Sequence, residues 1–290
     1  MKIEKKQKLT GWLFLAPAVI LIIAMSFVPT FRALYTSLQT GAGTNLSWAG
    51  TLNFERIPRD RVFIQALQNT FTYLIIQVPI MIILGLVFAS LLNNPKLKFR
   101  GVFRTAIFLP SATALVAYSI IFRALFATDG FINSLLVNIG ILENNFNFFG
   151  HPTSARIIII LALIWRWTGY NMVFYLAGLQ NIDYSMFEAA KIDGANAFQS
   201  FFKITIPQLK PVILMTTIMS TNGTLQLFDE SVNLTNGGPG NSSITLAHHI
   251  FNQSFSGVPN FGYASAMSFV ILMIVATLAL VQMKVGDRRD

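Results

Sequence analysis

The sequence predicts an all-α integral membrane protein with six transmembrane helices. Apolar residues make up 53% of the 290-residue chain and charged residues only 11%, whereas soluble domains carry about 25% charged residues. The apolar residues gather in six runs, each long enough or nearly so for a helix to cross about 30 Å of hydrocarbon. Lysine and arginine flank these runs instead of forming one basic surface, so the net charge of +9 does not indicate nucleic-acid binding.

The first run covers residues 12–35 and follows a lysine-rich start. A secretory signal peptide has the same order of features. This run is long, however, contains Pro17 and Pro29, and ends without a clear small-residue cleavage site. These features favour an uncleaved first helix.

The other runs differ in polarity. The second contains no charge, the fourth contains Arg166, and the fifth is rich in hydroxyl and amide side chains. The third is short, but Arg104 and Arg123 bracket it and can extend their side chains toward the membrane surfaces. These five runs span residues 71–92, 107–121, 157–179, 212–228 and 263–283.

The positive charges predict the orientation. If the N-terminus is cytoplasmic, 14 of the 21 Lys and Arg lie in inner segments and 6 in outer ones, with Arg166 inside the bilayer. Cytoplasmic loops are enriched in Lys and Arg, so both termini are predicted to be cytoplasmic. The expected organisation is a cytoplasmic segment, first helix and outer loop over 1–65, a five-helix core over 66–283 with a long cytoplasmic loop at 181–209, and a cytoplasmic tail over 284–290.

The long cytoplasmic loop has the pattern of an ordered element. Ser185 and Glu188 have the spacing of a capping box at a helix start. The Gly194 that follows Asp193 can end that helix, because glycine tolerates the left-handed conformation. A second helical stretch is expected over 197–204, ending near Pro207. This pattern alone supports equally a docking surface for another protein and an ordinary amphipathic linker.

Three motifs resemble those of ATP-binding-cassette importer permeases of the maltose type. Residues 188–195 read EAAKIDGA and are followed by Pro207 and Pro211, as in the EAA loop of that family. Residues 234–240, LTNGGPG, resemble the family's loop after the fifth core helix, and residues 31–38, FRALYTSL, resemble the end of its first helix. The likeness covers nearly the whole chain, in order.

The resemblance implies a type I importer permease fold and a role as one membrane half of an ATP-driven sugar importer. The implied partners are a second, homologous permease, two copies of a cytoplasmic ATPase, an extracytoplasmic sugar-binding protein and the lipid of a bacterial cytoplasmic membrane. ATP and Mg²⁺ would bind to the ATPase, because this chain has no Gly-Lys pair and hence no P-loop. We therefore expect no cofactor in this chain and no enzymatic activity. The residues expected to contact the ATPase are Glu188, Ala189, Ala190, Asp193, Gly194 and Ala195.

The fourth and fifth runs contain the expected substrate path. Hydroxyls and amides need partners in hydrocarbon, so those of the fifth run should face the bundle interior or a polar path. Aromatic rings beside hydrogen-bonding groups, as in the fourth run, suit a sugar. The resemblance also places a sugar site on these two helices, and the residues expected to contribute are Trp167, Tyr170, Asn171, Ser220, Asn222 and Thr224. Arg166 is expected to have a structural or gating role.

Other interpretations remain open at this stage. The polar residues of the fifth run could serve helix packing, which the small Gly223 would favour. An importer of the same architecture could carry another solute, such as glycerol phosphate, although a phosphate favours a more cationic path. A stand-alone secondary transporter is less favoured, because every acidic residue lies in a loop, at a terminus or at a helix end. The subgroup suggests a di- or oligosaccharide, and the sequence does not name it.

Overall fold

The computed structural model describes residues 2–286, with the side chains of 2–7, 9 and 184 left out. The last four residues of the expected tail, 287–290, lie outside the described residues. The chain is mostly helical and divides into two compact units. One unit comprises 1–60 with 250–270, and the other comprises 61–249 with 271–290.

Within the described residues, four helical stretches are long and apolar enough to cross a membrane: 10–37, 61–93, 152–180 and 261–286. They confirm the first, second, fourth and sixth expected helices. The third expected helix is broken into a bent pair, which makes five spans if the pair counts as one. The fifth, α11 (Ile206–Leu225), forms as a helix but is too polar to be among these stretches. The count of six is therefore not confirmed.

The first helix is continuous through its second proline. It consists of α1 (Lys2–Ile22), the π-helical turn η1 (Ile23–Phe27) and α2 (Val28–Ser37). Pro29 has no amide hydrogen to donate, which would break a regular α-helix. The wider turn before it accommodates this loss, with the amide of Val28 bonded to the carbonyl of Ile23.

The rest of residues 1–60 forms a structure that the apolar runs did not predict. It contains a hairpin of β1 (Gln39–Ala42) and β2 (Asn45–Trp48), then α3 (Leu52–Arg56) and η2 (Ile57–Arg59). Asn53 is buried and its amide donates to the carbonyls of Ser37 and Gln39. Tyr263 donates to Asp60 over 2.7 Å, and Arg56 lies 4.1 Å from the centre of the same ring. These contacts fix the start of α13 (Phe261–Gly286) within this unit.

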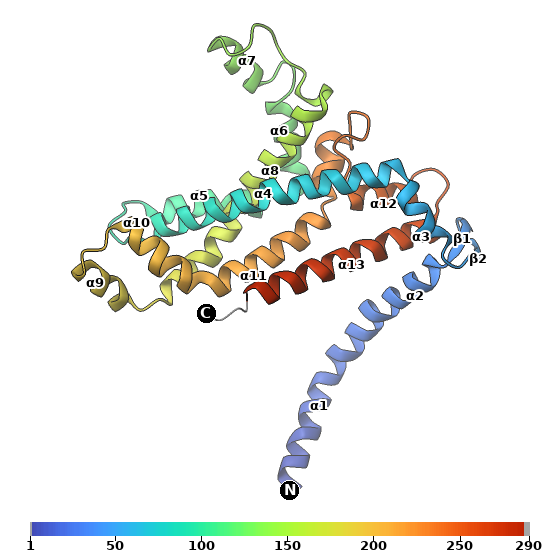
Figure 1. The fold of residues 1–290 in the computed structure, drawn as a ribbon, viewed down its shortest axis with the longest axis horizontal. Coiled ribbons are helices and arrows are strands. Elements are labelled where there is room, and N and C mark those ends of the chain that lie inside the picture. Colours follow the sequence, from blue (N-terminus) through green and yellow to red (C-terminus); the bar gives the residue numbers. More distant parts are fainter. Residues whose placement is uncertain (1, 287–290) are drawn as a thin grey trace. The chain divides into compact units, whose positions relative to one another are not determined.

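The second unit is built around α4 (Arg61–Asn93) and α8 (Pro152–Gln180), which pack along each other (Figure 1). Two clusters of buried side chains form its core, one around Tyr73, Tyr118 and Leu163, the other around Met172 and Tyr175. α4 starts at Arg61, so the expected boundary between 65 and 66 falls inside its first turns.

The third expected helix, 107–121, is wrong as a single straight span. α5 (Arg100–Ala112) and α6 (Leu115–Leu125) meet at an angle of 99°, because Thr113 and Ala114 adopt extended backbone conformations (Figure 1). The hydroxyls of Ser111 and Thr113 donate to the carbonyls of Phe108 and Leu109, which satisfies part of the polar end of α5.

The remaining elements of this unit flank the bundle. Between the long helices lie α7 (Phe131–Asn138), η3 (Phe148–Gly150), η5 (Ser231–Thr235) and α12 (Leu246–Phe255), the last of which runs on into the first unit. The expected cytoplasmic loop contains α9 (Tyr184–Ile192), α10 (Ala197–Ser200) and the π-helical turn η4 (Phe201–Thr205), which leads into α11.

Candidate functional site: an exposed helix and a polar cavity

α9 forms at the expected position, but it begins differently from the prediction. The expected capping box at Ser185 and Glu188 is wrong. Asp183 is the N-cap, and its carboxylate accepts the amide of Ser185 over 3.0 Å. This hydrogen bond lowers the pKa of the Asp183 carboxyl. Because Asp183 starts the helix first, Ser185 already lies inside it and cannot cap it.

A capping box does occur, but at the next helix. The side chain of Asn196 accepts the amide of Gln199, and the side chain of Gln199 accepts the amide of Asn196, at 2.8 and 2.9 Å. The predicted pattern was therefore present one helix later, with amide side chains in place of hydroxyl and carboxyl groups. Two short helices, each with its own cap, give the segment a defined shape.

The end of α9 agrees with the prediction of a glycine stop. Gly194 has φ +76°, and its amide bonds to the carbonyl of Lys191. The amide of Ala195 bonds to the carbonyl of Ala190 over 2.9 Å. This pair of bonds is the Schellman motif, which needs a left-handed residue at the position of Gly194.

The expected ATPase-contacting residues lie together on this segment and are accessible. Glu188, Ala189, Asp193 and Gly194 are exposed, and Ala190 and Ala195 are half-buried. Two large apolar side chains on the same segment also face outward, Ile192 at 85% and Phe198 at 71% exposure. The segment thus presents an apolar surface with small residues between larger ones, as a protein-binding surface would.

The helix after α9 was expected to end near Pro207, but it continues past this residue. α10, η4 and α11 form one uninterrupted helix from Ala197 to Leu225. The π-helical turn precedes Pro207, and the amide of Ile206 bonds to the carbonyl of Phe201. As in the first helix, the wider turn absorbs the proline. The turn at 193–196 therefore connects α9 to one continuous helix that begins at Ala197 and includes α11.

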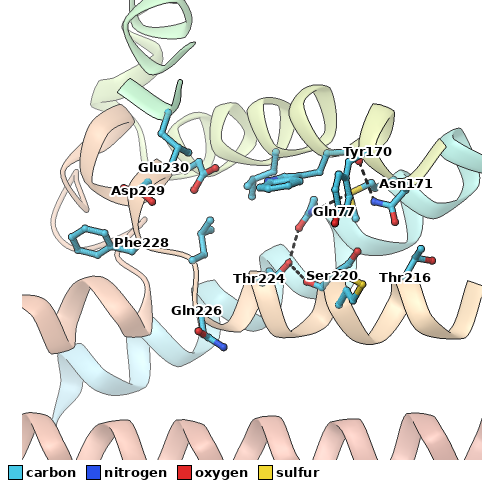
Figure 2. A pocket seen from close by; sticks show the side chains of 17 residues that line it. Gln77, Tyr170, Asn171, Thr216, Ser220, Thr224, Gln226, Phe228, Asp229 and Glu230 are labelled. Atoms are coloured by element: carbon cyan, nitrogen blue, oxygen red, sulfur yellow. Dashed lines mark hydrogen bonds between the residues drawn. The ribbon is translucent and has the colours of Figure 1, made fainter. Parts of the chain in front are cut away.

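α4, α6, α8, α11 and the segment after α11 line a cavity of about 500 Å³ (Figure 2). This volume lies in the range of about 300–1,000 Å³ that is typical of small-molecule sites. Five of the six expected substrate-path residues line it: Trp167, Tyr170, Asn171, Ser220 and Thr224. The sixth, Asn222, does not line it. Its side chain is exposed and accepts a hydrogen bond from Gln226, which does line the cavity.

Sequence reasoning missed Gln77 of α4. It is 2% exposed, lines the cavity, and accepts the hydroxyl of Thr224 over 3.0 Å. Figure 2 shows this bond joining α4 to α11 across the cavity wall. A single amide inside an otherwise apolar run was the signal that could have found it, because such a group needs a partner in hydrocarbon.

A second polar bridge joins α8 to α11. The hydroxyls of Tyr175 and Thr216 lie 2.8 Å apart, and both side chains are buried. On the cavity side of α8, the rings of Trp167 and Tyr170 meet edge to face at 5.7 Å. Aromatic rings and hydroxyl or amide groups thus meet in one cavity, which is the composition that binds the apolar face and polar edge of a sugar ring.

Arg166 and Glu230 form the charged end of this region. Arg166 is 7% exposed and its guanidinium carbon lies 4.8 Å from the ring of Tyr118 and 5.2 Å from that of Trp167. Its Nε and Nη1 have no hydrogen-bond partner, and neither does the Tyr118 hydroxyl. Glu230 was expected in an outer loop, but it is 3% exposed and lines the cavity together with Asp229. No signal in the sequence distinguishes it from a loop carboxylate.

The LTNGGPG motif at 234–240 forms an ordered turn. Asn236 and Gly237 adopt left-handed conformations and the Gly238–Pro239 bond is cis. Ser243 donates to the carbonyl of Gly238 over 2.6 Å, and Ser231 lies 2.9 Å from the Nδ1 of His248. Among the described residues, no group of three or more His, Cys, Asp or Glu could hold a metal ion.

The family model and the relatives that match this chain are permease components of transport systems. The family model for the binding-protein-dependent transport system inner membrane component matches residues 81–289. The lactose transport system permease protein LacF of Rhizobium radiobacter is 50% identical over 99% of this chain and 97% of its own length. The arabinooligosaccharides transport system permease protein AraP of Halalkalibacterium halodurans is 34% identical over 96% of this chain and 87% of its own.

More distant relatives extend the agreement. The trehalose/maltose transport system permease protein MalF of Thermococcus litoralis is 31% identical over 100% of this chain and 98% of its own length. A chain of a bacterial ABC transporter that imports the acidic polysaccharide alginate has the same fold, with a TM-score of 0.84 at 21% identity and 99% coverage of both chains. The protein therefore belongs to the binding-protein-dependent transport system inner membrane components, as a carbohydrate ABC importer permease that is a transport subunit and not an enzyme.

Proposed function

We propose that this chain forms half of the translocation path of an ATP-driven importer of di- or oligosaccharides and couples to a cytoplasmic ATPase through α9 and the turn at Gly194. One observation supports the proposal above the others. A short turn at 193–196 connects α9 to α10, which continues as uninterrupted helix into α11 with the cavity-lining Ser220 and Thr224. Movement at the segment would therefore reach the cavity directly.

The complete assembly would contain a second, homologous permease, two ATPase subunits that bind ATP and Mg²⁺, and an extracytoplasmic sugar-binding protein. One solved alginate ABC transporter with the same fold is in complex with a substrate-bound periplasmic protein. With α11 as a sixth span, both termini are cytoplasmic and the chain lies in a bacterial cytoplasmic membrane. Lactose is the first sugar to test, because the lactose permease LacF shares 50% identity with this chain.

The cavity does not favour glycerol phosphate. Asp229 and Glu230 line it, whereas its lining includes neither lysine nor arginine. A phosphate would meet negative charge there and no cation. A saccharide, by contrast, offers hydroxyl groups that a carboxylate can accept.

The ATPase coupling can be tested by copurification from membranes that contain the chain with the permease and ATPase encoded beside it. The Gly194→Val variant should lose the ATPase, because a β-branched residue is strongly disfavoured at φ +76°. Gly194→Asn is the matched control and should retain it, because asparagine tolerates this conformation. A β-carbon at Gly194 meets no other atom within 4 Å, so the two variants differ in backbone strain and not in a clash with the rest of the chain.

Two outcomes would contradict the assignment of the coupling segment. If wild type and both variants insert in the membrane and none binds the ATPase, the assignment of 184–195 as the coupling segment is wrong. If all three bind it equally, the segment is not the point of contact. Sugar-stimulated ATP hydrolysis by the reconstituted assembly, with lactose and its binding protein, tests the transport function separately.

A further inference from the structure

The end of the cavity that lies beyond α11 is acidic. Glu230 is 3% exposed, and Figure 2 shows its carboxylate directed into the space between the helices. Asp229 lines the same end. None of the 17 residues that line the cavity is a lysine or arginine. A solute in this cavity therefore meets carboxylate groups without a cation beside it.

A cation lies behind the wall instead. Arg166 does not line the cavity, and the adjacent Trp167 does. The guanidinium is held against the rings of Tyr118 and Trp167, and two of its nitrogens have no hydrogen-bond partner. A buried carboxylate is costly unless a positive charge compensates it. Arg166 and Glu230 both lie beside Tyr118, so the guanidinium can compensate the carboxylate without lining the cavity.

The ionisation of Glu230 depends on this arrangement. Burial raises the pKa of the Glu230 carboxyl and the neighbouring Asp229 raises it further, whereas the Tyr118 hydroxyl and, less strongly, Arg166 of α8 lower it. Tyr118 of α6 is the other titratable group that faces it. The guanidinium thus opposes the effect of burial and favours the charged carboxylate, while its position outside the cavity lining keeps it from binding an anion there.

We infer that Glu230 is a specificity-determining residue that excludes acidic saccharides, those bearing a uronate or aldonate carboxylate, from a path that admits neutral ones. Arg166 is the positioning residue that keeps Glu230 charged. The hydroxyls of a neutral saccharide donate to the carboxylate, whereas a sugar carboxylate in the cavity is repelled at short range in a medium of low dielectric constant. The inference rests on the proposed function, because it takes the cavity to be the sugar path.

The test compares a neutral disaccharide with its acid, in which oxidation also opens the reducing-end ring. Lactose is neutral, and lactobionate is its oxidised form with a carboxylate. Their binding is measured by saturation-transfer NMR on the assembled permeases and ATPases in lipid nanodiscs. The sugar-binding protein is left out, so that its own selectivity does not enter. We expect wild type to bind lactose more tightly than lactobionate by about tenfold or more at pH 7.5, as expected for one like-charge contact in a partly desolvated site.

The variants separate charge from structure. Glu230→Gln should reduce the preference to less than about threefold, since it removes the charge and keeps the shape. Glu143→Gln is the matched control: this carboxylate is exposed and outside the cavity, so the preference should not change. In Arg166→Met the preference should be half lost at a higher pH than in wild type. Arg166→Lys should return that pH to the wild-type value. A merely structural role of Arg166 would not move that pH.

The outcomes distinguish this inference from the function on which it rests. If wild type binds both sugars equally, or if Glu230→Gln keeps the full preference, the inference is overturned and the proposed function stands. If wild type binds neither sugar, the cavity is not a sugar path and both fail. If Glu230→Gln prefers lactose as strongly as Glu143→Gln does, Glu230 does not determine the specificity of the site.

Discussion

The close packing of α5 on α8 gives a prediction that can be worked out from distances. A β-carbon on Gly169 would lie 1.9 Å from the carbonyl oxygen of Ile107 and 2.9 Å from the Cα of Phe108. Both are backbone atoms and cannot rotate away. To restore an ordinary contact of about 3.5 Å, α5 would have to move by roughly 1.5 Å against α8. Overpacking of this kind costs about 1–3 kcal/mol, and the better helix propensity of alanine recovers at most about 1 kcal/mol.

The Gly169→Ala variant should therefore melt about 4 °C or more below wild type, taking a net loss near 2 kcal/mol. The measurement is thermal unfolding of the purified chain in one detergent, followed by tryptophan fluorescence. Gly223→Ala is the control, because Gly223 is also inside a membrane helix but has no atom within 4 Å of the added carbon. Equal melting of both variants and wild type would refute the close approach of α5 to α8.

Two further predictions concern polar contacts. Tyr175→Phe removes the 2.8 Å contact with Thr216 and should lower the stability of the chain by about 1 kcal/mol in urea titrations, with Thr217→Val as a comparison outside this bridge. Burial and the nearby His249 lower the pKa of His248, so its contribution to stability is present above about pH 6.5 and is lost as the pH falls through the lowered pKa. Thermal melts from pH 7.5 to 5 should show this loss in wild type and a smaller one in His248→Gln.

The positions of most helices could be predicted because long apolar runs permit little else in a membrane. Proline was a poor guide to where they end. Pro29 and Pro207 are each preceded by a π-helical turn and lie in continuous helix. The bend at 113–114 has no glycine, and neither residue is a helix breaker. Pro110 lies inside α5, three residues before the bend, but helices in this chain also continue through Pro17, Pro29 and Pro207, so proline alone does not mark the break.

The candidate site was predicted where local chemistry was distinctive. Hydroxyls, amides and aromatic rings marked two of the expected helices, and the family resemblance selected Tyr170 and Thr224 on them; both line the cavity. Asn222 was included as a neighbour in sequence, but a helix turns it to another face. Glu230 could not be predicted, because its burial depends on how the segment after α11 packs near α6 and α8.

The break between α5 and α6 has a consequence for what surrounds it. Ala114 provides no side-chain cap to the start of α6, so the first amides of that helix have no side-chain acceptor there. Hydrocarbon offers no acceptor either, and irregular backbone at membrane depth occurs only against protein or water. Leu115, the first residue of α6, lines the cavity. If the elbow at 112–115 lies at membrane depth, water or protein must cover it, and lipid chains are excluded from it.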